Sequence, residues 1–279
     1  MAELVINLEI EDASAAQFTF VQTCYGIPCF VFMVLALLFL SVKKRFSFPL
    51  YKLARMDLLV NICIYLNTWL AMRLEKFTFC IPMLKWIEVI CPGLLTFSRY
   101  LTNYFFHLQF LSCAIMTVNR IMTLKGVNGS TKFWNWFCLI FFVSACLYSP
   151  LPNYIFYRGF PSRTSIINGT LYRIRNEDKF KAVALSNAVF STVYFFLMAI
   201  LGGYSIVLFK RLKVTPNSPV AVKTLTQVTI TYSVVYSGIL LYCVLNGIDA
   251  HFPFYPSRVR EASTVVLGYT SDMVAITAV

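Results

Sequence analysis

Hydrogen-bonding side chains recur along one apolar stretch of the chain, Tyr100–Leu124. Its first twenty residues carry no formal charge, and Arg120 follows them directly. Twenty helical residues span the roughly 30 Å hydrocarbon core of a bilayer. Polar groups at that depth are costly unless they face other helices or a water-filled cavity. We therefore expect a membrane helix at the centre of a bundle, with these side chains turned inward: Asn103, His107, Gln109, Ser112, Thr117 and Asn119.

His107 lies in the half of this stretch that is farther from Arg120. Because a histidine inside a membrane helix is expensive, ligand contact is the first hypothesis for it. A hydrogen bond between helices is the alternative. Tyr104 and Tyr100 precede His107 by three and seven residues, so the three share a helix face. The predicted ligand pocket combines this face with residues of other helices: Asn67, Trp69, Tyr100, Tyr104, His107 and Tyr194.

Arg120 follows Asn119 at the opposite end of the same helix. An arginine in this place can lock an inactive bundle and turn toward a partner when helices move. The alternative is an anchor whose charged head reaches the lipid headgroups. Asp57 either pairs with Arg55, Arg120 or Gln227 as a switch, or simply lies at headgroup level. The predicted signalling residues are Asp57, Asn119, Arg120 and Gln227.

Catalytic motifs are missing from the sequence. It contains two histidines, His107 and His251, and no HExxH motif, clustered histidines, GxSxG motif or Walker loop. We therefore expect no enzyme activity, no metal and no cofactor. A small transporter or channel is the main alternative to a receptor, although internal repeats and proline-broken central helices, which transporters commonly have, are not evident. A structural or trafficking membrane protein is a third reading.

The composition is that of a membrane protein. Of 279 residues, 58% are hydrophobic and only 13% are charged, against about 25% in soluble domains. The net charge of +12 lies in short clusters between apolar runs, which favours contact with membrane lipid and not with nucleic acid. The sequence predicts an all-α bundle of seven transmembrane helices over Phe18–Val42, Met56–Met72, Tyr100–Leu124, Phe133–Tyr148, Ala182–Phe209, Leu225–Ile248 and Ala262–Val279.

The loops after the first, third and fifth predicted helices contain Lys and Arg but no Asp or Glu. Short basic loops stay in the cytosol, so we expect the N-terminus outside. Residues 1–17 then form a short extracellular segment and residues 18–279 the seven-helix domain. Two glycosylation sequons, at Asn128 and Asn168, test this topology. The prediction is a glycan at Asn168 and none at Asn128.

Cysteine usage does not indicate a secreted disulfide framework. Seven of the nine cysteines fall inside apolar runs, where cysteine acts as a small hydrophobic residue. Cys80 and Cys91 share a predicted outer loop and can either form a disulfide or stay free. Asp272, in the middle of the last apolar run, needs a partner or stays protonated.

Several stretches along the chain occur together in a known pattern: residues 56–75, 92–112, 116–120, 148–153 and 225–246, the VYFF of the fifth helix, and Ser271-Asp272-Met273. In these the chain resembles the nematode serpentine receptor class gamma family of chemosensory seven-helix receptors. The resemblance implies a multi-pass receptor of the plasma membrane that binds a small chemical outside and signals through a heterotrimeric G protein inside.

Arg120 is similar in place to the arginine in the Asp-Arg-Tyr signature of rhodopsin-like receptors. Its neighbours here are Asn119 and Ile121, so the acidic partner within that signature is missing. Members of the family continue past the last apolar run into a basic tail, whereas this sequence ends at Val279. We therefore expect a truncated last helix.

Overall fold

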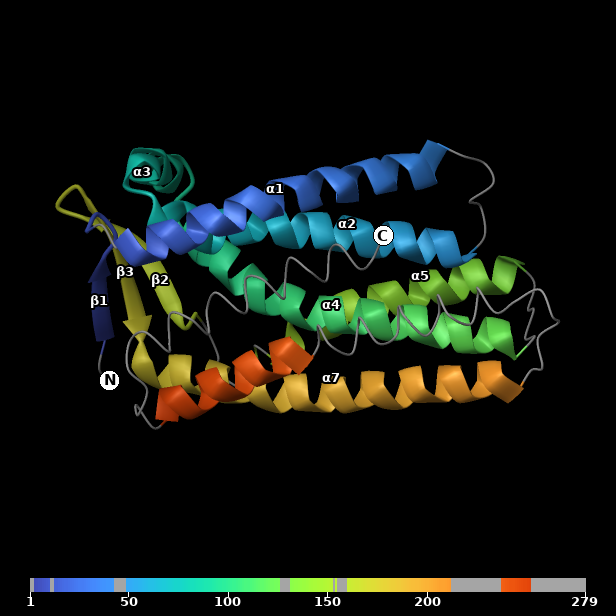
Figure 1. Ribbon diagram of the computed structural model, residues 1–279. Coiled ribbons are helices and arrows are strands. Elements are labelled where there is room, and N and C mark those ends of the chain that lie inside the picture. Colours follow the sequence, from blue (N-terminus) through green and yellow to red (C-terminus); the bar gives the residue numbers. More distant parts are fainter. Residues whose placement is uncertain are drawn as a thin grey trace.

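The computed structural model describes residues 3–10, 13–42, 49–125, 131–152, 154, 160–211 and 237–251. Long helices run side by side along one axis, and a small sheet closes the end at which the N-terminus lies (Figure 1). The helices are α1 (Ala13–Val42), α2 (Pro49–Thr68), α4 (Leu94–Leu124), α5 (Thr131–Tyr148), α7 (Glu177–Arg211) and a helix over 237–251. The predicted helical bundle is confirmed.

The helices α1, α2, α4, α5 and α7 all begin earlier than the apolar runs predicted for them. The helix α7 starts at Glu177, five residues before the expected Ala182, because the side chain of Asn176 accepts a hydrogen bond of 3.0 Å from the backbone N–H of Lys179. Glu177 and Asp178 in its first turn also favour a helix N-terminus. The helix α1 starts at Ala13 instead of Phe18. The last expected run, with Asp272, lies outside the described residues.

By length and apolar content, α1 and α7 can each cross a membrane. The segments Thr78–Ile90 and Leu94–Asn119 qualify only as a pair, bent by 98°. The helix α2 carries Lys52, Arg55 and Asp57 within its length, which makes it less apolar than α1. Polar groups on α2 and α4 are therefore placed where other helices, and not lipid, surround them.

A three-stranded antiparallel sheet, which the sequence reasoning did not predict, covers the end of the bundle. Its strands are β1 (Glu3–Asn7), β2 (Ser162–Ile167) and β3 (Thr170–Asn176), in the order β1-β3-β2. Asn168 and Gly169 form the turn between β2 and β3, with φ angles of 50° and 78°. An Asn-Gly pair is the preferred two-residue hairpin turn, because both positions require positive φ.

The connection between α2 and α4 is also structured. It contains a π-helical turn (Trp69–Arg73), two 3₁₀ turns (Leu74–Lys76 and Thr78–Cys80) and the helix α3 (Ile81–Ile90). Gly93, with a φ of 86°, allows the sharp turn into α4. Figure 1 shows α3 nearly end-on while the bundle helices run across the view. We use the name cap for β1, β2, β3 and α3 together.

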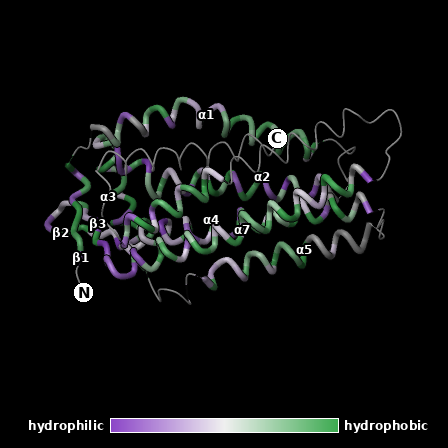
Figure 2. The backbone as a smooth tube through the Cα atoms, turned by 60° about the horizontal axis from the view of Figure 1, so that its bottom comes forward, coloured by the Kyte–Doolittle hydropathy of each residue, from purple (hydrophilic) through white to green (hydrophobic). Residues whose placement is uncertain are grey.

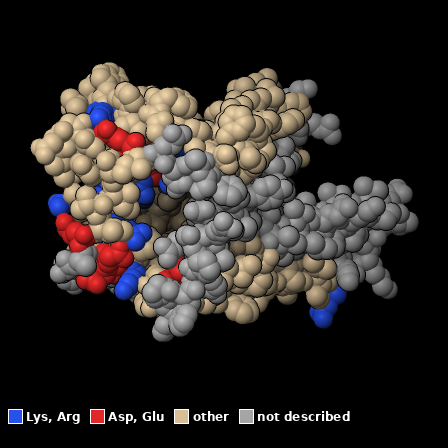
Figure 3. All heavy atoms as spheres, turned by 60° about the vertical axis from the view of Figure 1, so that its left-hand side comes forward, with Lys and Arg blue, Asp and Glu red and all other residues tan. Residues whose placement is uncertain are grey.

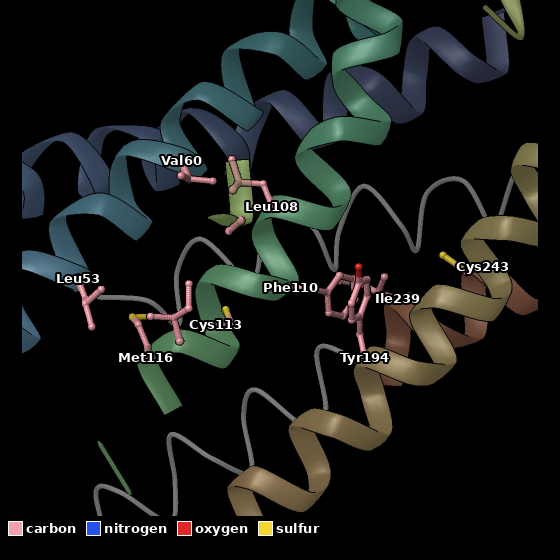
Figure 4. Close-up of a cluster of buried hydrophobic side chains, with 11 residues drawn as sticks. Leu53, Val60, Leu108, Phe110, Cys113, Met116, Tyr194, Ile239 and Cys243 are labelled. Atoms are coloured by element: carbon pink, nitrogen blue, oxygen red, sulfur yellow. The ribbon is translucent and has the colours of Figure 1, made fainter. Parts of the chain in front are cut away.

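The hydrophobic core is divided into three clusters. The largest joins α2, α4, α5, α7 and the helix over 237–251, and at its centre Phe110 stacks on Tyr194 with ring centroids 4.9 Å apart (Figure 4). A second cluster, around Leu84 and Leu171, lies under the cap. A third, around Met33 and Tyr65, holds α1 on α2. Each helix of the bundle is thus fixed by a neighbour on its inward side.

Polar and apolar residues separate along the long axis. Hydrophilic residues are concentrated around the cap, and the residues of the helices beyond it are mainly hydrophobic (Figure 2). On the face drawn in Figure 3, lysine, arginine, aspartate and glutamate side chains gather at the cap end. Large apolar side chains such as Phe32 and Phe196, 66% and 60% exposed, cover the outside of α1 and α7. Such surface is stable in contact with lipid tails.

Candidate functional site

His107 is enclosed by aromatic side chains of three helices. It is fully buried on α4, and its Nδ1 lies 3.0 Å from the hydroxyl oxygen of Tyr194 on α7. The rings of Phe190 and Tyr148 meet the imidazole edge-on, with centroids 5.0 and 6.4 Å away. Tyr194 in turn donates to the Tyr148 hydroxyl over 3.5 Å. We call this group, His107 with Phe106, Tyr148, Phe190 and Tyr194, the histidine cage.

One ring nitrogen of His107 has a special position. Among the described residues, Nε2 is buried and has no hydrogen-bond partner. A buried polar atom without a partner is costly, by about 1–3 kcal/mol. Neutral imidazole has one donor and one acceptor nitrogen, so the Nε2 atom can either give or take a hydrogen bond, according to the tautomer. The cage therefore offers one unused polar contact inside an apolar surrounding.

The structure brings part of the predicted ligand pocket together and separates the rest. Tyr104 packs against the core cluster that contains Tyr194, and Tyr194 is the residue that contacts His107. Asn67 turns toward α4, where its amide donates to the backbone oxygen of Ser98 over 3.0 Å. Tyr100 packs edge-on against Phe160, with ring centroids 5.6 Å apart.

Trp69, the first residue of the π-helical turn after α2, points away from the side on which Asn67 lies. It contacts Tyr65, at 6.2 Å between ring centroids, and belongs to the cluster between α1 and α2. The guanidinium of Arg73 lies over both rings, 5.4 Å from that of Tyr65 and 5.5 Å from that of Trp69. Trp69 is therefore placed toward α1 and not toward the histidine cage.

A second polar group links α2 to α4 deeper in the bundle. Asp57, 1% exposed, accepts a hydrogen bond of 2.6 Å from the Ser112 hydroxyl and one of 3.2 Å from the Asn61 amide. The oxygen of that Asn61 amide accepts a bond of 3.1 Å from Gln109. We call these four residues the aspartate network. It connects two helices through side chains that are all buried.

The donors to the Asp57 carboxylate include two neutral side chains that the sequence did not predict, those of Ser112 and Asn61. The expected pairing of Asp57 with Arg55, Arg120 or Gln227 stays a prediction. Gln227 lies outside the described residues, and for Arg120 only its place on α4 is described. Asn119, just before Arg120, is buried.

A cluster of formal charges ties the cap to the bundle. The carboxylate of Glu75 forms ion pairs with Arg99 of α4 and Arg173 of β3. All three side chains are largely buried, with exposures of 5%, 13% and 17%. A more exposed ion pair lies nearby, between Lys85 of α3 and Glu9, with 2.6 Å between the charged groups. We call Glu75, Arg99 and Arg173 the cap triad.

Two further predicted sites lie in the cap. Asn168 is exposed at the tip of the β2–β3 hairpin, so its amide is accessible to a modifying enzyme. Cys80 and Cys91 are both free. They stand at opposite ends of α3, and a ten-residue helix separates its ends by about 15 Å, too far for a disulfide. Burial raises the pKa of the Cys80 thiol, which lowers its reactivity further.

Sequence reasoning missed several of the residues that form these groups. The spacing of Asp57 and Asn61, one helical turn apart, was a signal for the aspartate network. The Asn-Gly turn was a signal for the hairpin that carries Arg173. No local pattern predicts that Tyr148, Glu75 or Arg99 would join residues far away in the chain. The described residues bring together no group of three or more His, Cys, Asp or Glu side chains that could hold a metal ion.

The chain is similar to known receptors over most of its length. The family described as Srg family chemoreceptor, a seven-transmembrane receptor family, matches residues 19–278. Serpentine receptor class gamma-47 of Caenorhabditis elegans is 30% identical over 267 residues, which are 92% of this chain and 84% of that receptor. Serpentine receptor class gamma-53 of the same organism is 30% identical over 144 residues, 50% of this chain and 47% of that receptor.

Proposed function

We propose, since this chain belongs to the Srg family of chemoreceptors, that it is a multi-pass receptor of the plasma membrane. In this proposal it detects a small chemical at the cap end, outside the cell, and signals through a heterotrimeric G protein at the opposite end. The observation that carries the proposal is the buried, incompletely bonded His107 inside an aromatic cage, on the helix that also carries the aspartate network.

The proposed orientation follows from the distribution of charge. The helices α1, α4 and α7 end, and α2 and α5 begin, at the end far from the N-terminus (Figure 1). The sequences that join them there, residues 43–55, 120–132 and 210–223, contain basic and no acidic residues. Acidic residues such as Glu3, Glu75 and Glu177 belong to the cap end. Because basic loops are retained on the cytosolic side, this distribution supports the proposal that the cap lies outside.

The proposed ligand contact is the Nε2 atom of His107. The cage walls are aromatic and apolar, and binding sites for small molecules usually combine such walls with a few polar groups. A ligand that offers one hydrogen-bonding group to Nε2 would remove the cost of its missing partner. Tyr104 and Tyr194 flank the site, whereas Asn67 and Tyr100 lie toward the cap and are proposed to line the approach.

The proposed coupling element is the aspartate network. Gln109 and Ser112 follow His107 on α4 by two and five residues, so a shift of α4 at the cage also moves these side chains against Asp57 and Asn61 on α2. Two packings of α4 on α2 would differ in which of these bonds are made, and a ligand that prefers one packing shifts the population. Asn119 and Arg120, at the far end of α4, are the proposed readout.

The proposal is tested by nucleotide exchange on G proteins. Membranes that contain the chain and a co-expressed Gα subunit are screened with a small-molecule library for uptake of a non-hydrolysable GTP analogue. We expect active compounds to stimulate exchange with the wild type and not with His107→Phe. The matched control is His251→Phe, because His251 is exposed and its Nδ1 lies 3.0 Å from the backbone oxygen of Gly247 in its own helix. That variant should respond like the wild type.

The main alternative, a transporter or channel, predicts a different outcome. Solute uptake or ionic current without any dependence on a G protein would replace the receptor assignment. Equal stimulation of the wild type and of His107→Phe would leave the receptor assignment in place but remove His107 from the ligand site. A chain that shows neither exchange, uptake nor current would favour a structural role.

A further inference from the structure

The helix α3 has two different faces. Ile81, Leu84 and Glu88 are buried against the rest of the cap and the start of α4. On the other side lie large apolar side chains that are widely exposed, by 43–78%. We call this side the outer face of α3; it consists of Phe79, just before the helix, and Met83, Trp86, Val89 and Ile90.

The charged side chains near α3 are turned away from its outer face. The ammonium group of Lys85 pairs with Glu9, 2.6 Å away at the edge of the cap. A carboxylate oxygen of Glu88 accepts a hydrogen bond of 2.7 Å from the backbone N–H of Gly93. The outer face therefore exposes apolar and aromatic groups without a charge among them. In water, such a patch is unfavourable, because it keeps apolar area exposed to solvent.

The direction of α3 decides what can cover this face. The segment that contains α3 is bent by 98° from α4, and Figure 1 shows it across the direction of the bundle. If the bundle helices cross the bilayer, α3 lies parallel to the membrane plane. An apolar helix in that orientation at the end of a bundle has the position of an interfacial amphipathic helix, whose apolar side reaches about 5–10 Å into the headgroup and acyl boundary.

A second apolar surface lies at the same end of the molecule. In Figure 1, α3 and the N-terminal part of α1 both lie at the end of the bundle that carries the sheet. There α1 exposes Phe20 by 62% and Val21 by 57%, on a helix long and apolar enough to cross a membrane. Trp86, 64% exposed, is of the residue type enriched at membrane interfaces, because its ring is apolar and its N–H still reaches water or headgroups.

From these observations we propose that the outer face of α3 is inserted into the bilayer interface, with phospholipid as its partner. The helix is bound to the rest of the cap by the Lys85–Glu9 pair and by Leu84 in the core under the sheet. Anchoring of α3 therefore sets the height of the whole cap at the membrane surface. This inference requires a membrane-spanning bundle and is independent of what the receptor detects.

Tryptophan fluorescence tests the proposal. The protein is placed in phosphatidylcholine nanodiscs, one copy to a disc, so that a second copy cannot cover α3. The chain has four tryptophans, Trp69, Trp86, Trp134 and Trp136, so the signal of Trp86 is taken as the difference between the wild type and Trp86→Phe. The conservative change at an exposed position leaves the core untouched. Trp136→Phe, at a site 66% exposed on α5, is the matched control.

We expect the Trp86 signal to be quenched by phosphatidylcholine brominated near the headgroup, less by lipid brominated near the chain end, and little by acrylamide in water. Strong quenching by acrylamide without quenching by bromolipid would place α3 in solvent and overturn the proposal. Protection from both quenchers in one-copy discs would mean that protein covers the face. Protection that appears only when two copies share a disc would assign the face to self-association, again against the proposal.

Discussion

The cap triad and the aspartate network each join separate segments of the chain through a buried carboxylate, but by different means. Glu75 is held by two guanidinium groups, those of Arg99 and Arg173. Asp57 receives hydrogen bonds from an uncharged hydroxyl and an uncharged amide. Formal charge is less costly at the end of the bundle, near water, than in its middle. In the cap, paired charges join the segments, whereas hydrogen bonds of defined direction from Ser112 and Asn61 contribute to the packing of α2 on α4.

The difference has a functional consequence. Removing one partner of a buried ion pair is strongly destabilising, so the cap triad holds its arrangement firmly. A hydrogen bond to a carboxylate contributes about 1.5–3 kcal/mol, less than the roughly 3–5 kcal/mol lost when one partner of a buried ion pair is removed. Such bonds can exchange between two helix packings at an energy that ligand binding can supply. We therefore expect the cap to act as a fixed support and the aspartate network to act as the part that changes.

The largest effect is expected for Glu75→Gln. This change leaves the guanidinium groups of Arg99 and Arg173 close together and without their carboxylate, and should lower the free energy of unfolding by about 3 kcal/mol. Thermal unfolding in detergent measures it. The control is Glu177→Gln, which removes the 2.7 Å ion pair with Arg175, a pair 29% and 26% exposed. That control should cost less than about 1 kcal/mol. If both variants lose the same free energy of unfolding, the buried ion pairs of the cap triad are no stronger than the exposed pair of Glu177 with Arg175.

A smaller effect is expected for Asp57→Asn, about 1–2 kcal/mol. The new amide still accepts from Ser112, but its NH₂ group meets the NH₂ group of Asn61. The swapped double variant, Asp57→Asn with Asn61→Asp, should recover most of the loss. In it the amide at position 57 donates to the carboxylate at position 61, which also accepts from Gln109. A double variant as unstable as the sum of the two single changes would refute the hydrogen-bond description of the network.

His107→Phe should change stability by no more than about 1 kcal/mol. Phenylalanine fills similar space inside the histidine cage, and the hydroxyl of Tyr194 keeps Tyr148 within 3.5 Å. Thermal unfolding compares this variant with Tyr194→Phe, which removes the other partner of the same contact. A loss as large as that of Glu75→Gln would make the cage a structural element and would weaken the assignment of a ligand contact to His107.

The smallest effect concerns acid. The hydrogen bonds from Lys85 and from the backbone N–H of Leu171 lower the pKa of Glu9 below its ordinary value of 4.5. A lowered pKa in the folded state adds stability above the unfolded pKa, and that stability is lost as the pH falls through the folded value. As the pH falls below about 4.5, we expect the amide hydrogens of β1 to exchange faster in the wild type, compared with the Glu9→Gln variant, which has no carboxylate at this position to protonate. If the ratio of the two exchange rates does not change with pH, the stabilising contact of Glu9 with Lys85 and Leu171 is contradicted.

The helices could be predicted from the sequence because long apolar runs in a lipid solvent have few alternatives to a helix. On the same ground His107 was expected to face inward, and it does. Its hydrogen bond to Tyr194 matches the alternative that the sequence left open, a bond between helices. The pairing of β1 with β3 was not foreseen. It joins Glu3 with Asn176, and such a distant contact leaves no local pattern in the chain.

The predicted pocket was too broad because two of its members cannot share a face. Asn67 and Trp69 are two residues apart, and on a helix such residues point in different directions. The neutral donors to Asp57 were missed for a different reason. A carboxylate in a membrane helix suggests a charged partner first, whereas Ser112 and Asn61 donate hydrogen bonds without carrying a charge themselves.

The central claim, that the cap faces outward as the sensing end, is tested most directly by glycan mapping in intact eukaryotic cells. The two sequons, at Asn128 and Asn168, belong to opposite ends of the proposed bundle. We expect wild-type protein to carry a glycosidase-sensitive mass shift that is lost in Asn168→Gln and kept in Asn128→Gln. A shift that survives Asn168→Gln and disappears in Asn128→Gln would place the cap in the cytosol and contradict the account.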